Sequence, residues 1–358
     1  MMNLNFYRNK TVLVTGHTGF KGSWLCKILI CAGAKVIGYS LIPQTNPNLF
    51  DLSKNEDSMI SIIGDIRDFS KLKTVFDKYQ PEIVIHMAAQ PIVRESYKEP
   101  RYTYDVNVLG TVNILECIRL TKSVKSFLNV TTDKVYLNDD KPNHPFEEDE
   151  PLDGYDPYSN SKSCSELVTH SYKKSFFQER DCSISTARAG NVIGGGDFAT
   201  DRVIPDCVRA LEKQQMMIVR NPYSTRPYQH VLEPLFMYLE ICEKQYGNKE
   251  FEGYYNVGPD DCDCVTTGEL VSMMCEQWGR GFSWTIKEDN GPHEASFLKL
   301  SNNKIKNTFG WKPTWHIDKA ISMICEWTDV YLKCSQNIPE EMEKEIKAFY
   351  EESCNNRV

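Results

Sequence analysis

Two side chains that could move a proton, Tyr158 and Lys162, stand four residues apart in a stretch with helical periodicity. On a helix this spacing places both side chains on one face. A nearby ammonium and the positive charge of an oxidised nicotinamide favour the phenolate, so Tyr158 could accept an alcohol proton near neutral pH. The pair predicts the acid/base device of an enzyme that oxidises an alcohol with a nicotinamide cofactor. Because the pattern is common by chance, its meaning depends on the elements around it.

A glycine turn near the start of the chain supplies that context. Gly16, Gly19 and Gly22 recur at every third residue, after an apolar strand and before a helix. Such a turn lets the backbone approach a pyrophosphate, and the helix N-terminus adds free N–H groups. A plain glycine turn is the alternative, but its place in a strand–helix–strand unit favours a dinucleotide site. The residues expected to contact the cofactor here are Gly16, His17, Thr18, Gly19, Phe20, Lys21 and Gly22.

The next strands bear on which dinucleotide is bound. The second strand, at 36–41, ends without an acidic residue for the ribose 2′-hydroxyl and without an arginine for a 2′-phosphate. Asp65 and Ile66, after the third strand, are placed to contact the adenine. We expect the cofactor to be NAD.

Short apolar segments alternate with helical segments through the first half of the chain. Strands are expected at 11–14, 35–38, 60–63, 82–86, 127–130 and 183–186, and helices at 23–32, 69–79, 101–120 and 158–177. This alternation predicts an α/β fold with a doubly wound parallel sheet of the Rossmann type. Residues 1–190 should form the NAD-binding domain and residues 191–358 mainly a smaller C-terminal α/β cap that binds substrate. A segment near 222–250 should return to the first domain, and further helices are expected at 233–244, 267–278 and 317–332.

Charge and cysteine usage exclude several classes of function. A net charge of −8 argues against a nucleic-acid partner, because phosphate backbones select basic surfaces. The thirteen cysteines are scattered without metal or dithiol spacing, so we expect no metal site and a reducing, cytoplasmic location. No secretory signal is recognised, and no segment has the roughly 20 apolar residues of a membrane span, so no membrane contact is expected.

Two further segments should converge with the tyrosine–lysine pair at the carboxyl ends of the strands. One follows the fourth strand and, with a nearby asparagine, is expected beside the cofactor. The other follows the fifth strand and is expected to take part in catalysis. These residues are Ala88, Ala89, Gln90 and Asn107 in the first group, and Thr132, Asp133 and Lys134 in the second.

Six segments together carry a resemblance to a known family. They are residues 16–25, 64–68, 86–91, 155–162, 188–197 and 226–231. They resemble the extended short-chain dehydrogenase/reductase family and, within it, the nucleotide-sugar 4,6-dehydratases, most of all those that act on CDP-glucose. The His17 and Lys21 variant of the glycine turn and the run Gly194-Gly195-Gly196 are the most subgroup-specific parts.

The resemblance implies a reaction without net redox change. Tyr158 would deprotonate the 4-hydroxyl of glucose while NAD takes the C4 hydride, and Thr132 would hydrogen-bond the same oxygen. Water would then leave from C5 and C6, and the hydride would return to C6. Related dehydratases carry Asp-Glu after this threonine, whereas this chain has Asp133-Lys134. Asp133 could be the acid if burial raises its pKa. Lys134 has three possible roles. It could be a base if its pKa is strongly depressed, it could stabilise the enolate, or it could be a bystander at the strand end.

The same resemblance implies the substrate contacts and the assembly. Asn191, Arg202, Arg220, Arg226 and, with less support, His293 should hold the CDP-sugar, although isolated arginines are often surface residues. The helices at 101–120 and 158–177 should pair across a two-fold axis in a homodimer. The implied pathway is bacterial surface-polysaccharide synthesis, as in the lipopolysaccharide O-antigen.

Two rival functions remain at this point. A nucleotide-sugar 4-epimerase shares the fold, NAD and the tyrosine–lysine pair but needs no acid/base pair for C5 and C6. A catalytically silent dinucleotide-binding protein would have little reason to retain Thr132, Tyr158 and Lys162 together. Asp133-Lys134 favours a dehydratase.

Overall fold

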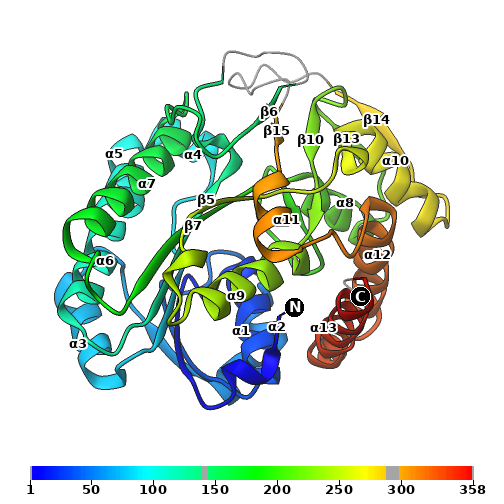
Figure 1. Ribbon diagram of the computed structural model, residues 1–358. Coiled ribbons are helices and arrows are strands. Elements are labelled where there is room, and N and C mark those ends of the chain that lie inside the picture. The colour runs from blue at the N-terminus through cyan, green and yellow to red at the C-terminus, as the bar shows by residue number, and fades with distance from the viewer. Residues whose placement is uncertain (1, 139–143, 288–297, 357–358) are drawn as a thin grey trace.

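A seven-stranded parallel sheet lies at the centre of the protein, for which a computed structural model describes residues 2–138, 144–287 and 298–356 (Figure 1). The strand order is β12-β7-β5-β4-β1-β2-β3. The order reverses between β1 and β4, and ligands bind at such a switch point in doubly wound sheets. The predicted Rossmann-type fold is confirmed. The strands are β1 (Thr11–Thr15), β2 (Lys35–Ser40), β3 (Ile60–Ile63), β4 (Ile83–His86), β5 (Ser126–Thr132), β7 (Ser183–Ala189) and β12 (Tyr254–Val257).

Helices cover both faces of this sheet, because the strands are apolar on both sides. On one face lie α1 (Phe20–Cys31) and α9 (Leu232–Gln245), with α2 (Leu49–Ser53) and α13 (Ile338–Asn355) packed against α1. On the other lie α3 (Phe69–Tyr79), α6 (Gly110–Leu120) and α7 (Pro157–Phe176). Local sequence sets the ends of several helices: the Asp156 side chain caps α7 by accepting from the Ser159 N–H, and Pro157 occupies the first turn.

The segment between β4 and β5 differs from the single helix expected at 101–120. It contains α4 (Val93–Lys98) and α5 (Pro100–Tyr104), then a π-helical turn (Asp105–Leu109) that leads into α6. A π-turn inserts one extra residue into the helical repeat and so changes which side chains face inward. Asn107 lies within it.

The cap is built around a separate apolar core between α8 (Val203–Glu212), α10 (Thr267–Trp278) and α12 (Ile317–Cys334). A capping box of Thr266 and Glu269 starts α10. α11 (Asn303–Phe309) packs against the edge strand β12 of the main sheet, and four short strand pairs lie outside that sheet. The pairs are β6 (Pro145–Phe146) with β15 (Lys299–Leu300), β8 (Val192–Ile193) with β11 (Gln229–His230), β9 (Met217–Val219) with β14 (Trp284–Ile286), and β10 (Thr225–Pro227) with β13 (Cys264–Thr266).

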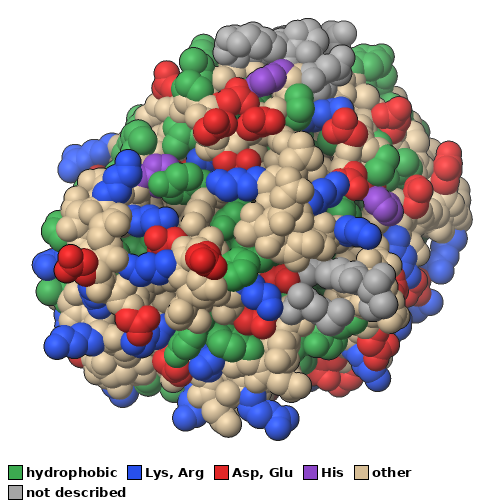
Figure 2. Space-filling view, in the orientation of Figure 1, with side chains coloured by type: hydrophobic (Ala, Val, Ile, Leu, Met, Phe, Trp, Pro, Cys, Tyr) green, Lys and Arg blue, Asp and Glu red, His purple; other side chains and the backbone are tan. Residues whose placement is uncertain are grey.

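The outer surface carries both signs of charge. Basic and acidic side chains are interspersed over the face seen in Figure 2. Across the described ranges, none of the helices combines the length and the apolar character needed to cross a bilayer.

Candidate active site

A cavity of about 1060 Å³ runs along the carboxyl ends of the strands and is lined by both the sheet and the cap. It brings together nearly all residues that the sequence analysis singled out. The side chains of His17 and Asn107 do not line it, and His293 lies outside the described residues. The candidate residues that line it are Gly16, Thr18, Gly19, Phe20, Lys21, Gly22, Asp65, Ile66, Ala88, Ala89, Gln90, Thr132, Asp133, Lys134, Tyr158, Lys162, Asn191, Arg202, Arg220 and Arg226.

The glycine turn forms a close-packed cradle at one end of the cavity. A Cβ on Gly22 would lie 2.0 Å from the carbonyl oxygen of Gly16, and one on Gly16 would lie 2.9 Å from the Ala88 nitrogen. Gly16 also has φ +77°, which favours glycine. A Cβ on Gly19 would meet only the Gly16 oxygen at 3.4 Å. Because α1 begins directly after Gly19, its N-terminal N–H groups face the cavity, and this arrangement fits a pyrophosphate.

The side chain of His17 has a different position from the one predicted. Its Nε2 lies 2.8 Å from the Ser61 hydroxyl, and its ring fills the space above Gly38, where a Cβ would come within 2.3 Å of it. Burial lowers the pKa of His17 to about 4. His17 therefore packs the glycine turn onto β2 instead of reaching a ligand, because the missing side chain of Gly38 leaves room for the ring.

Neutral hydroxyl groups occupy the end of β2, where the sequence lacks an acidic residue. Thr18 Oγ1 donates to the Leu41 carbonyl at 2.9 Å and lies 3.0 Å from the Ser40 hydroxyl. Thr18, Ser40 and Leu41 all line the cavity. Ribose contacts at this position would come from hydroxyl and backbone groups.

Asn107 also has a role other than the predicted one. Its Oδ1 accepts from the Gln90 N–H at 2.8 Å, and its Nδ2 donates to the Ser161 hydroxyl at 2.9 Å. It thereby fixes the loop after β4, which carries Ala88 to Gln90, against α7. Because Asn107 lies in the π-turn, its side chain points toward the protein interior, and the residue is 1% exposed.

Tyr158 and Lys162 lie on α7 at the floor of the cavity, and burial dominates the pKa of each. Burial raises the pKa of Tyr158 to about 12, against a hydrogen bond with Thr132 that lowers it. Burial also lowers the pKa of Lys162 to about 8, against the nearby charge of Glu166. Lys162 Nζ donates to the Val130 carbonyl at 3.1 Å. Desolvation outweighs the favourable interactions that the protein itself supplies to Tyr158, and the predicted contribution of an oxidised nicotinamide comes in addition to these.

The segment Thr132-Asp133-Lys134 ends β5 and begins a short 3₁₀ turn, Asp133–Val135. Thr132 Oγ1 donates to Asp133 Oδ1 at 2.9 Å, and Oδ2 has no hydrogen-bond partner among the described residues. Asp133 is 1% exposed, and this burial raises its pKa against the charges of Lys134 and Arg226. Burial therefore favours the protonated form of Asp133 over the carboxylate, as a proton donor requires.

Lys21 lines the same cavity. Its Nζ donates to the Tyr238 hydroxyl at 3.0 Å. Burial, with the charges of Lys162 and Arg202, lowers the pKa of Lys21 to about 7. The charge on this side chain can thus change close to neutral pH. Tyr238 lies on α9, far along the chain, and sequence spacing gave no signal for this contact.

Two of the three predicted arginines in the cap are already paired with carboxylates. Arg202 Nη1 lies 3.0 Å from Asp197 Oδ2, and Arg220 Nη1 lies 2.6 Å from Asp201 Oδ1. Arg226, on β10, is 6% exposed and donates to the Thr225 carbonyl at 3.1 Å. A bound diphosphate would have to compete with the aspartates for Arg202 and Arg220. The sequence analysis missed these aspartates, although both stand in the same loop as Arg202.

A second cluster lies at the start of α12. Cys262, Asp263 and His316 place their ligand atoms within 4.8 Å of one another. The Asp263 carboxylate accepts from the Ile317 N–H at 2.9 Å and lies 2.9 Å from His316 Nδ1. These contacts begin the helix, which explains the cluster by its structural role.

Comparison with known proteins identifies the family. The GDP-mannose 4,6-dehydratase family matches residues 13–324. The chain is 46% identical over 340 residues to the CDP-glucose 4,6-dehydratase of Salmonella typhimurium, covering 93% of this chain and 94% of that one. It is 31% identical over 331 residues to a UDP-glucose 4-epimerase of Mycolicibacterium smegmatis, covering 88% and 97%.

Solved structures give the same fold. A dTDP-glucose 4,6-dehydratase from Bacillus anthracis in complex with NAD superimposes with a TM-score of 0.75 at 22% identity, covering 91% of this chain and 98% of that one. A Thermus thermophilus UDP-glucose 4-epimerase complex with NAD gives 0.76 at 23% identity, covering 89% and 99%. Glycine cradle, tyrosine–lysine pair and fold thus agree with the sequence matches: the chain belongs to the GDP-mannose 4,6-dehydratase family of extended short-chain dehydrogenase/reductase proteins.

Proposed function

We propose that this protein converts CDP-D-glucose to CDP-4-keto-6-deoxy-D-glucose and water, with NAD as its cofactor. The observation that carries the proposal is the 46% identity, over 93% of the chain, to a CDP-glucose 4,6-dehydratase. A nucleotide-sugar 4-epimerase is the second candidate, because relatives of that activity also match nearly the whole chain. The pair Asp133-Lys134, which lines the cavity beside Thr132, favours elimination.

The cradle would hold the cofactor. Gly16, Gly19 and the N-terminus of α1 suit its pyrophosphate, Thr18 suits a ribose, and Asp65 with Ile66 suits the adenine. Bound NAD would supply the hydride-accepting and hydride-donating chemistry that the oxidation at C4 and the reduction at C6 require.

Tyr158 and Thr132 would act on the sugar 4-hydroxyl. Thr132 can hydrogen-bond this oxygen, and Tyr158 can take its proton once it has lost its own. The raised pKa of Tyr158 opposes that loss, while the positive charges of Lys162 and of an oxidised nicotinamide favour it. The resulting 4-ketone makes the C5 proton acidic.

Asp133 and Lys134 would serve the elimination step. Asp133, whose pKa is raised by burial, can donate a proton to the leaving 6-hydroxyl when it is protonated. Lys134 lines the same cavity from the adjacent position in the turn. Its side chain would then stabilise the enolate that forms when another basic group takes the C5 proton. Lys134 could instead act as the base that removes this proton, and variants of the residue separate the two roles.

The cap would bind the nucleotide diphosphate. Asn191, Arg202, Arg220 and Arg226 face the cavity from this side. Guanidinium groups suit phosphate oxygens because they can make two parallel hydrogen bonds. The proposed role of His293 in this pocket remains an expectation from the sequence.

A homodimer built on α6 and α7 is also proposed. Exposed apolar side chains on these elements support it: Leu120 of α6 is 48% exposed and Leu167 of α7 is 52% exposed. Single exposed leucines are common, but leucines gathered on two adjacent helices suit a packed interface. We further propose a cytoplasmic enzyme that supplies a deoxysugar precursor for surface polysaccharide such as the O-antigen.

The test is to incubate the purified protein, with and without added NAD, with CDP-glucose and separately with dTDP-, UDP- and GDP-linked sugars. Mass spectrometry should show loss of one water from CDP-glucose alone. Loss of water from another sugar would change the nucleotide assignment. Interconversion at C4 without water loss would establish an epimerase, and no change in any sugar would contradict both candidate activities.

A further inference from the structure

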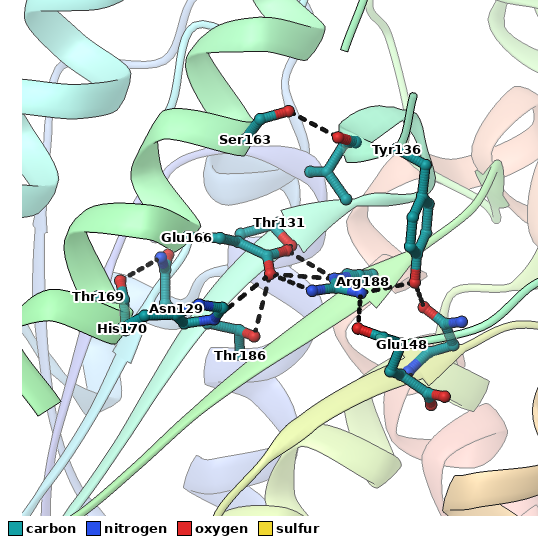
Figure 3. A network of polar contacts seen from close by, with 12 residues as sticks. Asn129, Thr131, Tyr136, Glu148, Ser163, Glu166, Thr169, His170, Thr186 and Arg188 are labelled. Atoms are coloured by element: carbon teal, nitrogen blue, oxygen red, sulfur yellow. Dashed lines mark hydrogen bonds and ion pairs between the residues drawn. The ribbon is translucent and has the colours of Figure 1, made fainter. Parts of the chain in front are cut away.

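A buried ion pair lies beneath the reactive residues, between α7 and the sheet (Figure 3). Glu166 of α7 and Arg188 of β7 form its centre, with side chains 0% and 1% exposed. Arg188 Nη2 donates to Glu166 Oε2 at 2.6 Å, and its Nε donates to Oε1 at 2.9 Å. Such a two-bond geometry fixes both the distance and the relative orientation of the two side chains.

Glu166 ties α7 to β5. The Thr131 hydroxyl donates to Glu166 Oε1 at 2.5 Å, and Thr131 directly precedes Thr132. Lys162, one turn before Glu166, donates to the Val130 carbonyl at 3.1 Å. The helix that carries Tyr158 is therefore attached to the strand that carries Thr132 through two neighbouring bonds.

Arg188 ties the same network to the turn after β5. Its Nη1 donates to the Tyr136 hydroxyl at 2.6 Å, and its guanidinium lies 4.8 Å from the centre of that ring. Tyr136 in turn donates to Asn256 Oδ1 at 2.6 Å, on β12 (Figure 3). From α7, the Ser163 hydroxyl donates to the Val135 carbonyl at 2.7 Å. The turn that carries Asp133 and Lys134 is thus held at its carboxyl end.

We propose that the Glu166–Arg188 pair is the positioning element of the active site, which sets α7 against β5 and the following turn. This inference rests on the proposed function, because positioning matters only if Tyr158 and Thr132 act together. Stability alone does not explain the pair, since apolar residues of similar volume usually stabilise a core as well as a buried ion pair does.

The electrostatic part of the proposal concerns Lys162. Burial lowers its pKa, and the Glu166 carboxylate opposes this effect. The other titratable groups that interact with it are Lys21 from α1 and His86 from β4, and the Lys162 charge lowers the pKa of both. Of these three neighbours, only Glu166 contributes a negative charge.

The principal test is Glu166→Gln, which keeps the side-chain volume and removes the charge. We expect kcat for ketone formation from CDP-glucose to fall about 10- to 100-fold with little change in KM, because the reactive groups lose their alignment. The alkaline limb of the pH profile should move to lower pH by about one unit, because Lys162 then loses its proton more readily. The ¹³Cε chemical shift of Lys162 in protein with labelled lysine should report the same shift without any reaction.

A second variant covers the case in which the unpaired Arg188 prevents folding. Glu166→Leu combined with Arg188→Met removes both charges and should retain a melting temperature near that of the native protein. Its kcat should still fall. Thr131→Val, which removes only one contact of the network, should give a smaller loss of the same kind. Glu343→Gln, which breaks the remote Lys27–Glu343 pair, is the control and should leave kcat and the pH profile unchanged.

The outcomes separate the two proposals. Folded variants with native kcat and an unmoved Lys162 titration would overturn the positioning role. A native protein that forms no ketone from CDP-glucose would overturn the proposed function, while the Lys162 titration would still decide whether Glu166 holds that charge.

Discussion

The two walls of the cavity hold their charges in different ways. On the sheet side, Glu166 and Arg188 are buried and bound to each other by several hydrogen bonds. On the cap side, Arg220 and Asp201 form a pair whose side chains are 35% and 39% exposed. A buried pair cannot exchange partners without leaving a charge in a poor solvent, whereas a partly exposed pair can do so at little cost. Under the proposed function, the buried pair would keep the reactive residues in place on the sheet side, and the partly exposed pair would exchange its partner for the ligand on the cap side.

The largest expected loss of activity comes from removing one oxygen atom on the sheet side, in the variant Tyr158→Phe. In Tyr158→Phe the hydroxyl is absent, so ketone formation should fall by about 10²- to 10⁴-fold, the usual range for loss of an acid/base group. The measurement is 4-keto product from CDP-glucose by mass spectrometry, with circular dichroism to confirm the fold. Turnover near the native rate would remove Tyr158 from the mechanism.

Lys134→Ala, also on the sheet side of the cavity, should separate the oxidation step from the loss of water. We expect the near-ultraviolet absorbance of reduced nicotinamide to develop on addition of substrate, because Tyr158 and Thr132 are intact. Loss of water should fall about 100-fold, the effect of removing one group that stabilises a developing charge. Lys134→Arg, which keeps the positive charge, should recover much of the rate if the role is electrostatic and little if Lys134 is the base. Unimpaired product formation in Lys134→Ala would make the residue a bystander.

The glycine cradle offers a matched pair of substitutions. In Gly22→Ala the new Cβ would lie 2.0 Å from the Gly16 carbonyl oxygen, which should destabilise the protein by about 1–3 kcal/mol, as overpacking commonly does. In Gly19→Ala the nearest atom is 3.4 Å away, so the fold should be retained while NAD binding weakens. Thermal unfolding and calorimetric NAD titration measure the two effects. Equal unfolding temperatures would contradict the packing argument.

Substitutions on the cap side should change the KM for CDP-glucose. Arg220→Ala should raise the KM for CDP-glucose about tenfold, because one guanidinium contact to a phosphate is lost, while kcat changes little. Arg280→Ala, which breaks the remote exposed pair with Asp329, is the matched control and should leave both constants unchanged. A fall in kcat alone would show that the cap takes part in setting the reaction geometry.

The smallest expected effect is on stability, from Asp133→Asn. The pKa of Asp133 is raised in the folded protein, so the folded state binds more protons than the unfolded state between the two pKa values. Stability contributed by this residue is therefore lost as pH rises through that interval. Asp133→Asn should melt at a higher temperature than the native protein at alkaline pH, by a difference that vanishes at acid pH.

Local sequence was sufficient for most of the fold. The bounds predicted for the helices at 69–79 and 267–278 agree with α3 and α10, because capping groups mark their first turns: Asp68 for α3 and the Thr266–Glu269 box for α10. Among the elements that were missed, α13 and β12 differ in the sequence signal that they carry. The spacing of Ile338, Met342, Ile346 and Phe349 is a helical signal that could have indicated α13. β12 is only four residues long and contains a polar Asn256, so it carries no clear pattern.

The site was less predictable than the fold. Residue type and position placed most candidates at one edge of the sheet, because the carboxyl ends of parallel strands converge there. They could not show that Gly38 makes room for the ring of His17, or that a π-turn directs Asn107 onto Gln90. Nor could they show that the charge balance of the cap includes Asp197 and Asp201. Each of these depends on a contact between segments far apart in sequence or on local backbone geometry.

The edge strand β12 has a consequence for how the protein can be made. It pairs with β7 through residues 254–257, so the sheet acquires its last strand only after about seven tenths of the chain has been synthesised. A fragment that stops near residue 190 would leave the backbone N–H and C=O groups of β7 unpaired at the edge of an apolar sheet, an arrangement prone to aggregation. The ribosome must therefore synthesise the chain through residue 257 before the sheet can be completed, and expression of residues 1–190 alone should give insoluble protein.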